Sequence, residues 1–288
     1  MIVIRDAMEM REWSLARRAE GKRIGLVPTM GALHEGHASL MRAAADADDV
    51  AIATIFVNPT QFAPHEDFDK YPRTWDEDVA IATTAGIQAI YAPKASGMYP
   101  ADYSTFVTVE GVSEGLCSLT RPHFFRGVAT VVTKLFNATL PHRAYFGQKD
   151  AQQCAVIKRM ARDLDMGIEI IEMPIVREED GLAMSSRNRY LSPEERERAL
   201  CISRALFAAQ YAMRAGERDA AAITDAVKAG ISDLKIDYVE LVDAASMKPV
   251  TAIENEVTLA VAAFCGATRL IDNIKFSPSA VTENNPAV

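Results

Sequence analysis

The fold of this chain is decided by the stretch Val27-Pro28-Thr29-Met30-Gly31-Ala32-Leu33-His34-Glu35-Gly36-His37. An apolar run with strand character, residues 23–27, precedes it, and an alanine-rich run that favours helix, residues 38–45, follows it. The predicted order is therefore strand, turn and helix. Two imidazoles lie where a helix N-terminus offers N–H groups and partial positive charge to an anion, and the glycines let a ligand approach the backbone. The stretch thus predicts a phosphate-binding turn.

Three other interpretations of this stretch compete with a phosphate site. A zinc protease motif needs histidines four residues apart on one helical face, whereas His34 and His37 are three apart with Gly36 between them. A P-loop begins like residues 31–36, but His37 and Ala38 stand where its lysine and its serine or threonine belong. A purely structural role, in which the histidines cap and solvate a helix start, stays open on this stretch alone.

The composition is that of a globular protein whose partners are small molecules. The 288 residues are enough for one large or two medium domains, and 49% of them are hydrophobic. A net charge of −8 argues against a surface for nucleic acid or anionic membrane. No signal-peptide pattern and no apolar run of membrane-spanning length is present, so we expect a cytoplasmic protein. Thiols rather than disulfides are expected, because no Cys-x-x-Cys motif joins the widely spaced Cys117, Cys154, Cys201 and Cys265.

A second apolar run predicts a buried parallel strand. Residues 50–57 are almost continuously apolar, as expected for a strand in a parallel sheet that helices cover on both faces. The run ends at Asn58-Pro59-Thr60-Gln61-Phe62, and the carboxyl edge of such a sheet is where open α/β folds bind ligands. Gln61 is therefore a candidate ligand-binding residue, although its position equally suits a side chain that only satisfies its own loop.

The next segments continue an alternation of strands and helices. A helix is predicted over residues 75–85, with acidic residues in its first turn, where carboxylates offset the helix dipole. Binding of Mg²⁺ through one of the three carboxylates there, Asp76, Glu77 or Asp78, is the alternative role. Strands are predicted over residues 87–92 and 103–109. The β-α-β-α-β rhythm is typical of an α/β fold.

A second strand, glycine turn and helix follow from residue 143 onward. The strand stops at Gly147-Gln148-Lys149-Asp150, and the helix then begins with Gln152 and Gln153 in its first turn. Lys149 stands where it can reach phosphate oxygens, although a Lys-Asp pair at a helix start also serves as a surface cap.

Residues 177–191 form a polar loop that contains a glycine. Ser185, Ser186 and Arg187 offer hydroxyl and guanidinium groups suited to phosphate oxygens, but a solvated linker would have a similar composition. A capping box with proline at the first helical position, Ser192-Pro193-Glu194-Glu195, then starts a new helix.

The C-terminal third has a different organisation. Helices are predicted to about residue 215 and over residues 219–234, and strands over residues 237–242, 257–264 and 268–276. Two helices followed by short strands indicate a small α+β domain. The predicted domains are thus residues 1–176 and residues 177–276, with residues 177–191 as hinge and phosphate-binding loop. The polar tail, residues 277–288, is predicted to be disordered.

Six stretches taken together resemble the pantoate:beta-alanine ligase family, the pantothenate synthetases. They run in order from residue 28 to residue 273 as Pro28 to His37, Phe56 to Phe62, Tyr71-Pro72-Arg73-Thr74, Phe146 to Gln153, Asp180 to Asn188, and Arg269-Leu270-Ile271-Asp272-Asn273. The resemblance implies a Rossmann-like N-terminal nucleotidyltransferase domain and a smaller C-terminal lid. It also implies that the pantoate carboxylate attacks the α-phosphate of ATP, and that the amine of beta-alanine displaces AMP from the resulting pantoyl adenylate.

The resemblance assigns roles to individual residues. His34, His37 and Lys149 are the expected catalytic residues, with His37 as proton donor. Gln61 is expected to bind pantoate and beta-alanine, and Gln153 to bind pantoate. The expected ATP-binding residues are Met30, Gly31, Ala32, Leu33, His34, Glu35, Gly36, His37, Gly147, Gln148, Lys149, Asp150, Val176, Met184, Ser185, Ser186 and Arg187. Mg²⁺ is expected to bridge the phosphates, with Glu77 or Asp78 as its ligand, and the protein is expected to form a homodimer.

Two features leave alternatives to this assignment. Phe124 occupies the position of a histidine common in the family and His123 is displaced by one, so His123 is not expected to be catalytic; Ile81 replaces a polar residue near the expected metal. A related nucleotidyltransferase that keeps the nucleotide in its product is one alternative function. A nucleotide-binding module without catalysis is the other.

Overall fold

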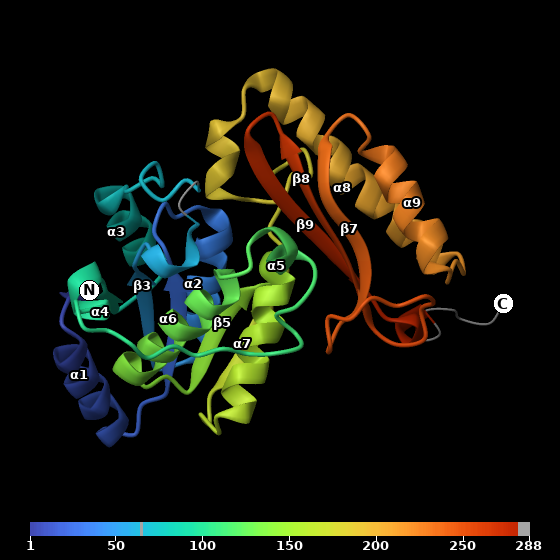
Figure 1. Cartoon of the computed structure of the whole chain (residues 1–288). Coiled ribbons are helices and arrows are strands. Elements are labelled where there is room, and N and C mark those ends of the chain that lie inside the picture. The colour runs from blue at the N-terminus through green and yellow to red at the C-terminus, as the bar shows by residue number, and fades with distance from the viewer. Residues whose placement is uncertain (64–65, 282–288) are drawn as a thin grey trace. The chain divides into compact units, whose positions relative to one another are not determined.

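The computed structural model describes residues 1–63 and 66–281, and its first part is an α/β fold around one parallel sheet (Figure 1). The sheet order is β1-β4-β3-β2-β5-β6, and each pairing is parallel. The strands are β1 (Ile2–Ile4), β2 (Ile24–Thr29), β3 (Val50–Ile55), β4 (Ala89–Tyr91), β5 (Arg143–Gly147) and β6 (Glu169–Met173). Five of the six residues of β3 are buried, which explains the continuous apolar run in the sequence.

Helices connect and cover these strands. The longer ones are α1 (Ala7–Ala19), α2 (Glu35–Ala47), α3 (Trp75–Thr84), α6 (Phe124–Thr139) and α7 (Ala151–Asp163); α4 (Ala95–Met98) and α5 (Cys117–Thr120) are single turns. α6 packs against α1, and α2 packs against α3 and the central strands. The core beneath α2 and α3 is formed by Leu40, Met41, Ala82 and Ile90 with their neighbours.

The order of the strands locates a switch point between β2 and β5. From β2 the chain continues through β3 to β4 on one side of the sheet, and β5 and β6 lie on the other side. Ligands of open α/β sheets bind at the carboxyl ends of the strands beside such a reversal. The ends of β2 and β5 are Thr29 and Gly147, at the two motifs that the sequence singled out.

The strand predicted over residues 103–109 is wrong. The segment forms no strand and joins no sheet, and only residues 106–109 alternate between exposed and partly buried. Val107 N donates instead to Thr130 Oγ1 of α6 (2.9 Å), and the cations of Lys134 and Arg126, also from α6, lie over the rings of Tyr103 and Phe106. The segment is therefore held by contacts with α6 rather than by pairing with a strand.

The C-terminal part is a small α+β structure, as predicted. Two helices, α8 (Pro193–Arg214) and α9 (Ala220–Gly230), accompany an antiparallel sheet of β7 (Lys235–Asp243), β8 (Val257–Cys265) and β9 (Thr268–Phe276) in the order β7-β8-β9. The predicted capping box is present, with Ser192 accepting from Glu195 N and Glu195 accepting from Ser192 N. Buried side chains such as Leu206, Met213 and Val261 fill the core between the helices and this sheet.

Contacts divide the chain into two compact units. Unit 1 comprises residues 1–110, 120–148 and 156–176, and unit 2 comprises residues 111–119, 149–155 and 177–288. The predicted division placed residues 149–155 in the N-terminal domain, whereas their contacts group them with unit 2. The tail begins with a 3₁₀ turn, η4 (Pro278–Val281); the rest of the segment predicted to be disordered, residues 282–288, lies outside the described residues.

Candidate active site

The turn after β2 begins at its last residue and has a left-handed backbone. Thr29 Oγ1 donates to Thr54 O on β3 (2.6 Å) and accepts from Gly31 N (3.2 Å). Gly31 has φ +82° and Ala32 has φ +51°. These bonds and dihedral angles make the chain leave the sheet in a fixed direction at the carboxyl end of β2.

A buried carboxylate from α3 holds this turn. Asp78 Oδ2 accepts from Ala32 N (3.0 Å) and Oδ1 accepts from Leu33 N (2.7 Å). The Thr74 hydroxyl also donates to Oδ1 (3.1 Å), and Asp78 is only 1% exposed. A Cβ on Gly31 would lie 2.8 Å from Asp78 Oδ2, so glycine fits both the positive φ and the close carboxylate.

The two histidines lie together at the start of α2. His34 is the N-cap residue, and His37 is the third residue of the helix. Their ring centroids are 4.0 Å apart, and both Nδ1 atoms are buried. The rings therefore share one site at a helix N-terminus, where the partial positive charge favours an anion. Either imidazole can donate a hydrogen bond to a phosphate oxygen there.

Gln61 is oriented by Asn58 in the 3₁₀ turn η1 (Pro59–Gln61). Asn58 Nδ2 donates to Gln61 Oε1 (3.0 Å) and to Gly127 O (3.2 Å), and Asn58 is 1% exposed. Because Gly127 O only accepts hydrogen bonds, it fixes which end of the Asn58 amide carries the donor. The Gln61 amide nitrogen is then left to donate to Met30 Sδ (3.0 Å), which brings two of the expected site residues together.

Tyr99 and Gly127 complete the support of this turn. The Tyr99 hydroxyl donates to Asn58 Oδ1 (2.7 Å). Burial raises the pKa of Tyr99 to about 12, so the phenol keeps its proton near neutral pH. A Cβ on Gly127 would lie 2.4 Å from Thr60 O, so α6 can approach η1 this closely only because residue 127 has no side chain.

In unit 1, Gly147 and Gln148 stand at the carboxyl end of β5, and Val176 closes the last segment of the unit. Unit 2 resumes at Lys149 and carries Asp150 and Gln153. Lys149 Nζ lies 3.8 Å from Asp150 Oδ2. Gln152, by contrast, is buried and donates to the carbonyls of Val112, Glu114 and Gly115, which gives it a structural role.

The loop after β6 folds into a 3₁₀ turn, η3 (Ser186–Tyr190), that begins at Ser185. Ser185 Oγ accepts from Arg187 N (3.3 Å), and Ser185 O accepts from Asn188 N (3.0 Å). Met184 immediately precedes this turn. Ser185, Ser186 and Arg187 are therefore held in one compact segment of the loop of residues 177–191, and this whole loop is called the phosphate loop below.

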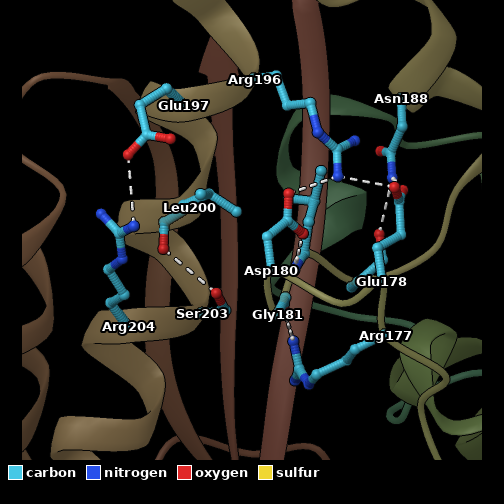
Figure 2. A network of polar contacts seen from close by, with 12 residues as sticks. Arg177, Glu178, Asp180, Gly181, Asn188, Arg196, Glu197, Leu200, Ser203 and Arg204 are labelled. Carbon is cyan, nitrogen blue, oxygen red and sulfur yellow. Dashed lines mark hydrogen bonds and ion pairs between the residues drawn. The ribbon is translucent and has the colours of Figure 1, made fainter.

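Ion pairs connect the phosphate loop to α8 (Figure 2). Glu178 Oε1 accepts from Asn188 Nδ2 (2.7 Å), and its Oε2 pairs with Arg196 Nη2 (2.7 Å). The same Arg196 nitrogen lies 2.5 Å from Asp180 Oδ2. Figure 2 shows the Arg196 guanidinium between the two carboxylates. Arg196 is about one-third exposed, so these pairs are partly screened by water.

Comparison with known proteins gives the family. A family model described as Pantoate-beta-alanine ligase matches residues 2–275. The chain belongs to the pantoate-beta-alanine ligase family. A pantothenate synthetase from Moorella thermoacetica is 53% identical over 277 residues, which cover 95% of this chain and 98% of that protein. The resemblance read from the six sequence stretches is thus confirmed.

Solved structures of pantothenate synthetases agree with the family. The crystal structure of the Thermus thermophilus enzyme matches with a TM-score of 0.91 and 38% identity, covering 96% of this chain and 100% of that one. The pantoate-beta-alanine ligase of Francisella tularensis, complexed with beta-gamma ATP and beta-alanine, matches with a TM-score of 0.76 and 30% identity over 95% of this chain and 97% of that one.

The surroundings of Asp78 do not suit the role of Mg²⁺ ligand that the resemblance assigned to it. The carboxylate is buried and already accepts three hydrogen bonds, so a hydrated ion has no access to it. Glu77 is exposed and offers a single carboxylate. Among residues 1–63 and 66–281, no group of three or more His, Cys, Asp or Glu side chains is arranged to hold an ion. These contacts argue against the expected magnesium role of Asp78, whereas that role of Glu77 stays a prediction from the resemblance.

Asn58 was absent from the predicted site residues, although the structure makes it the centre of the Gln61 turn. The sequence carried one signal for it, because asparagine before Pro59 is a favoured N-cap. Gly127 carried none, because its close approach joins segments far apart in the sequence. Arg121, whose Nη2 donates to Gln61 O (3.1 Å) and to Glu66 Oε2 (2.8 Å), was likewise not predicted.

Proposed function

We propose that this chain uses ATP to join pantoate to beta-alanine in two half-reactions. In the first, a pantoate carboxylate oxygen attacks the α-phosphorus of ATP, and the bond to pyrophosphate breaks. In the second, the amine of beta-alanine attacks the acyl carbon of pantoyl adenylate, loses a proton and expels AMP to leave pantothenate. The observation that most strongly supports this proposal is the pair of imidazoles at the start of α2, beside the switch point of the sheet. The chain that carries this pair matches the ligase family over residues 2–275.

The histidine pair serves the first half-reaction. Charge accumulates on the non-bridging oxygens of the α-phosphate as pantoate attacks, and donors fixed in place stabilise it without reorganising. His34 and His37 stand side by side at a helix N-terminus, where they donate to those oxygens. His37 is the proposed proton donor. The fixed turn around Gly31 keeps the two rings in this arrangement.

We assign the remaining nucleotide contacts to the other expected residues of the chain. Lys149 and Arg187 neutralise the charge of the departing pyrophosphate, and the Ser185 and Ser186 hydroxyls bind its oxygens. Backbone and apolar groups of the other expected residues bind the adenosine. These are Met30, Gly31, Ala32, Leu33, Glu35, Gly36, Gly147, Gln148, Asp150, Val176 and Met184.

Two glutamines bind the acyl substrate. Gln61 is oriented by Asn58, and Gln153 stands in the first turn of α7. Their uncharged amides can bind the hydroxyl and carboxylate groups of pantoate without neutralising the attacking oxygen. Gln61 also contacts beta-alanine in this proposal.

Magnesium enters this proposal as part of the Mg-ATP complex. Mg²⁺ keeps several waters and is commonly held by substrate phosphates with only one or two carboxylates. That mode suits a chain in which Asp78 is committed to the turn after β2. The ion would supply charge neutralisation at the phosphates.

A cytoplasmic homodimer completes the proposal. No disulfide joins the cysteines within the part of the chain that the structure describes, which suits a reducing compartment. In the same described residues, no helix has the length and apolar character needed to cross a membrane. The dimer is proposed by analogy with the family. Light scattering of the purified protein tests it: a mass of one chain would reject it.

Pyrophosphate release tests the two half-reactions. The protein is mixed with Mg-ATP and pantoate, and beta-alanine is added later, while pyrophosphate, AMP and pantothenate are measured. With pantoate alone, we expect a burst of pyrophosphate equal in molar amount to the enzyme. After beta-alanine is added, we expect sustained formation of AMP and pantothenate. Incorporation of the nucleotide into the product would favour the related nucleotidyltransferase. ATP binding without pantoate-dependent release would favour the binding module.

A further inference from the structure

Asp272 and Asn273 are two adjacent residues of β9 that the proposed mechanism does not use. Both belong to the stretch Arg269-Leu270-Ile271-Asp272-Asn273, one of the six that resemble the family. They are 4% and 3% exposed, respectively. Buried polar side chains in a sheet are costly unless they are hydrogen-bonded, so their partners indicate their purpose.

Asp272 holds the base of the phosphate loop. Its two carboxylate oxygens accept from Arg177 Nη1 (2.6 Å) and Nη2 (2.9 Å), which is a bidentate pair. Arg177 Nη1 also donates to Gly181 O (3.1 Å), a bond drawn in Figure 2, and Arg177 forms a β-bridge with Ala183. Ala183 is two residues before Ser185. The carboxylate therefore fixes the strand-like base from which the loop leaves.

Asn273 holds the other phosphate-binding segment. Its Nδ2 donates to the carbonyl of Lys149 (3.0 Å), and its backbone N–H donates to Asp272 Oδ1 (2.7 Å). Burial raises the pKa of the Asp272 carboxyl, and Arg177, the Asn273 N–H and the charge of Lys149 oppose that rise. The charge of Lys149 thus acts on Asp272, and the backbone carbonyl of Lys149 is hydrogen-bonded to the adjacent Asn273.

We propose that Asp272 and Asn273 are positioning residues that hold Lys149 and the phosphate loop in fixed register within unit 2. The two side chains bind segments that lie far apart in the sequence, and each segment carries a group proposed to neutralise pyrophosphate. Unit 2 contains all of these residues. This inference rests on the proposed roles of Lys149 and Arg187, and it extends them to the strand behind both.

The test separates the two half-reactions. Asn273→Asp keeps the size of the side chain but puts an acceptor opposite the Lys149 carbonyl, and Asn273→Ala removes the donor without adding charge. We expect the rate of pyrophosphate formation to fall by about 10- to 100-fold, because the Lys149 ammonium would be misplaced. The Mg-ATP concentration that half-saturates the reaction should rise. The reaction of supplied pantoyl adenylate with beta-alanine involves no pyrophosphate, so its rate should stay within about threefold.

A control variant and a mutant cycle exclude a general loss of structure. Ile274→Val, at the next buried position of β9, changes packing but leaves the Asp272–Arg177 pair and the Asn273–Lys149 hydrogen bond in place. It should leave the ratio of the two half-reaction rates unchanged. In a Lys149→Ala background, Asn273→Ala should reduce the rate of pyrophosphate formation much less than it does in the wild type, because no ammonium remains to be positioned.

Two outcomes would overturn the inference. One is an equal slowing of both half-reactions by the Asn273 variants, and the other is full additivity with Lys149→Ala. Wild-type protein that releases no pyrophosphate with pantoate would instead reject the proposed function itself, so the two failures are distinguishable.

Discussion

The turn after β2 and the phosphate loop after β6 are proposed to serve one substrate, but different forces hold them. Backbone N–H groups and a hydroxyl converge on the buried Asp78 at the turn, and neutral amides orient Gln61 nearby. The phosphate loop is tied to α8 by ion pairs of Arg196, whose side chain is about one-third exposed. Hydrogen bonds to a buried charge contribute about 1.5–3 kcal/mol each, whereas exposed pairs contribute about 0.2–1 kcal/mol.

This difference suggests a division of labour. The first region needs rigid geometry, since the imidazoles must meet charge that appears only in the transition state. The second region binds groups that are charged before and after the reaction, and beyond its base at Arg177 and Asp272 it is held to α8 by partly exposed ion pairs. Salt and solvent should therefore affect the second region more than the first.

The largest effect is expected from His37→Ala. Loss of a proton donor commonly slows a reaction by about 10²- to 10⁴-fold, and we expect that loss in single-turnover formation of pantoyl adenylate. Thermal unfolding should change little, because the helix-start position tolerates a small residue. His123→Ala is the matched control, since His123 is an exposed helix N-cap. Adenylate formation at the wild-type rate in His37→Ala would remove this histidine from the mechanism.

Gly127→Ala tests the rigidity of the first region. The new Cβ would collide with Thr60 O at 2.4 Å and push η1 from α6, so the pantoate KM should rise about tenfold or more. Overpacking should also lower the free energy of unfolding by about 1–3 kcal/mol. Gly97→Ala is the control, because its Cβ meets no atom within 4 Å and it lies in α4. Wild-type pantoate binding in Gly127→Ala would show that the turn can shift without cost.

Asp78→Asn distinguishes a structural carboxylate from a metal ligand. The NH₂ group of the new amide would face a backbone N–H, and two donors cannot form a hydrogen bond. We therefore expect the free energy of unfolding to fall by about 1–3 kcal/mol. The Mg²⁺ concentration that half-saturates adenylate formation should stay as in the wild type, and Glu77→Ala tests the other expected ligand in the same assay. A marked increase in that Mg²⁺ requirement for Asp78→Asn would restore the carboxylate to the metal site.

The smallest effect is expected from Glu178→Gln in the second region. It weakens the pair with Arg196 and should cost about 0.2–1 kcal/mol of unfolding free energy at low salt. The difference from wild type should shrink as ionic strength rises, because salt screens exposed charges. Urea denaturation at a low and a high salt concentration measures it. A cost independent of salt would contradict the contrast between the two regions.

Local patterns in the sequence were enough for the strands, most helices and the capping box at Ser192, because these depend on near neighbours. Two features escaped them. The alternation of residues 103–109 looked like a strand, but the segment contacts α6 instead of pairing with a neighbouring strand. Lys149 groups with unit 2, and its carbonyl accepts a hydrogen bond from Asn273, which is 124 residues distant along the chain.

The same limit of local patterns applies to the candidate site. The histidine pair and the Ser185 segment are short motifs with recognisable chemistry. Asp78 was singled out for its charge, but its burial and its backbone partners exist only in the folded chain. Asn58 and Gly127 support Gln61 through contacts that no local pattern encodes.

Isotopic labelling tests the central claim most directly. Pantoate labelled with ¹⁸O in its carboxylate is converted with Mg-ATP and beta-alanine, and the AMP is analysed by mass spectrometry. Attack of the carboxylate on the α-phosphorus predicts that AMP carries one ¹⁸O from pantoate. Unlabelled AMP, or label in inorganic phosphate, would contradict the adenylate route and the roles assigned to both regions.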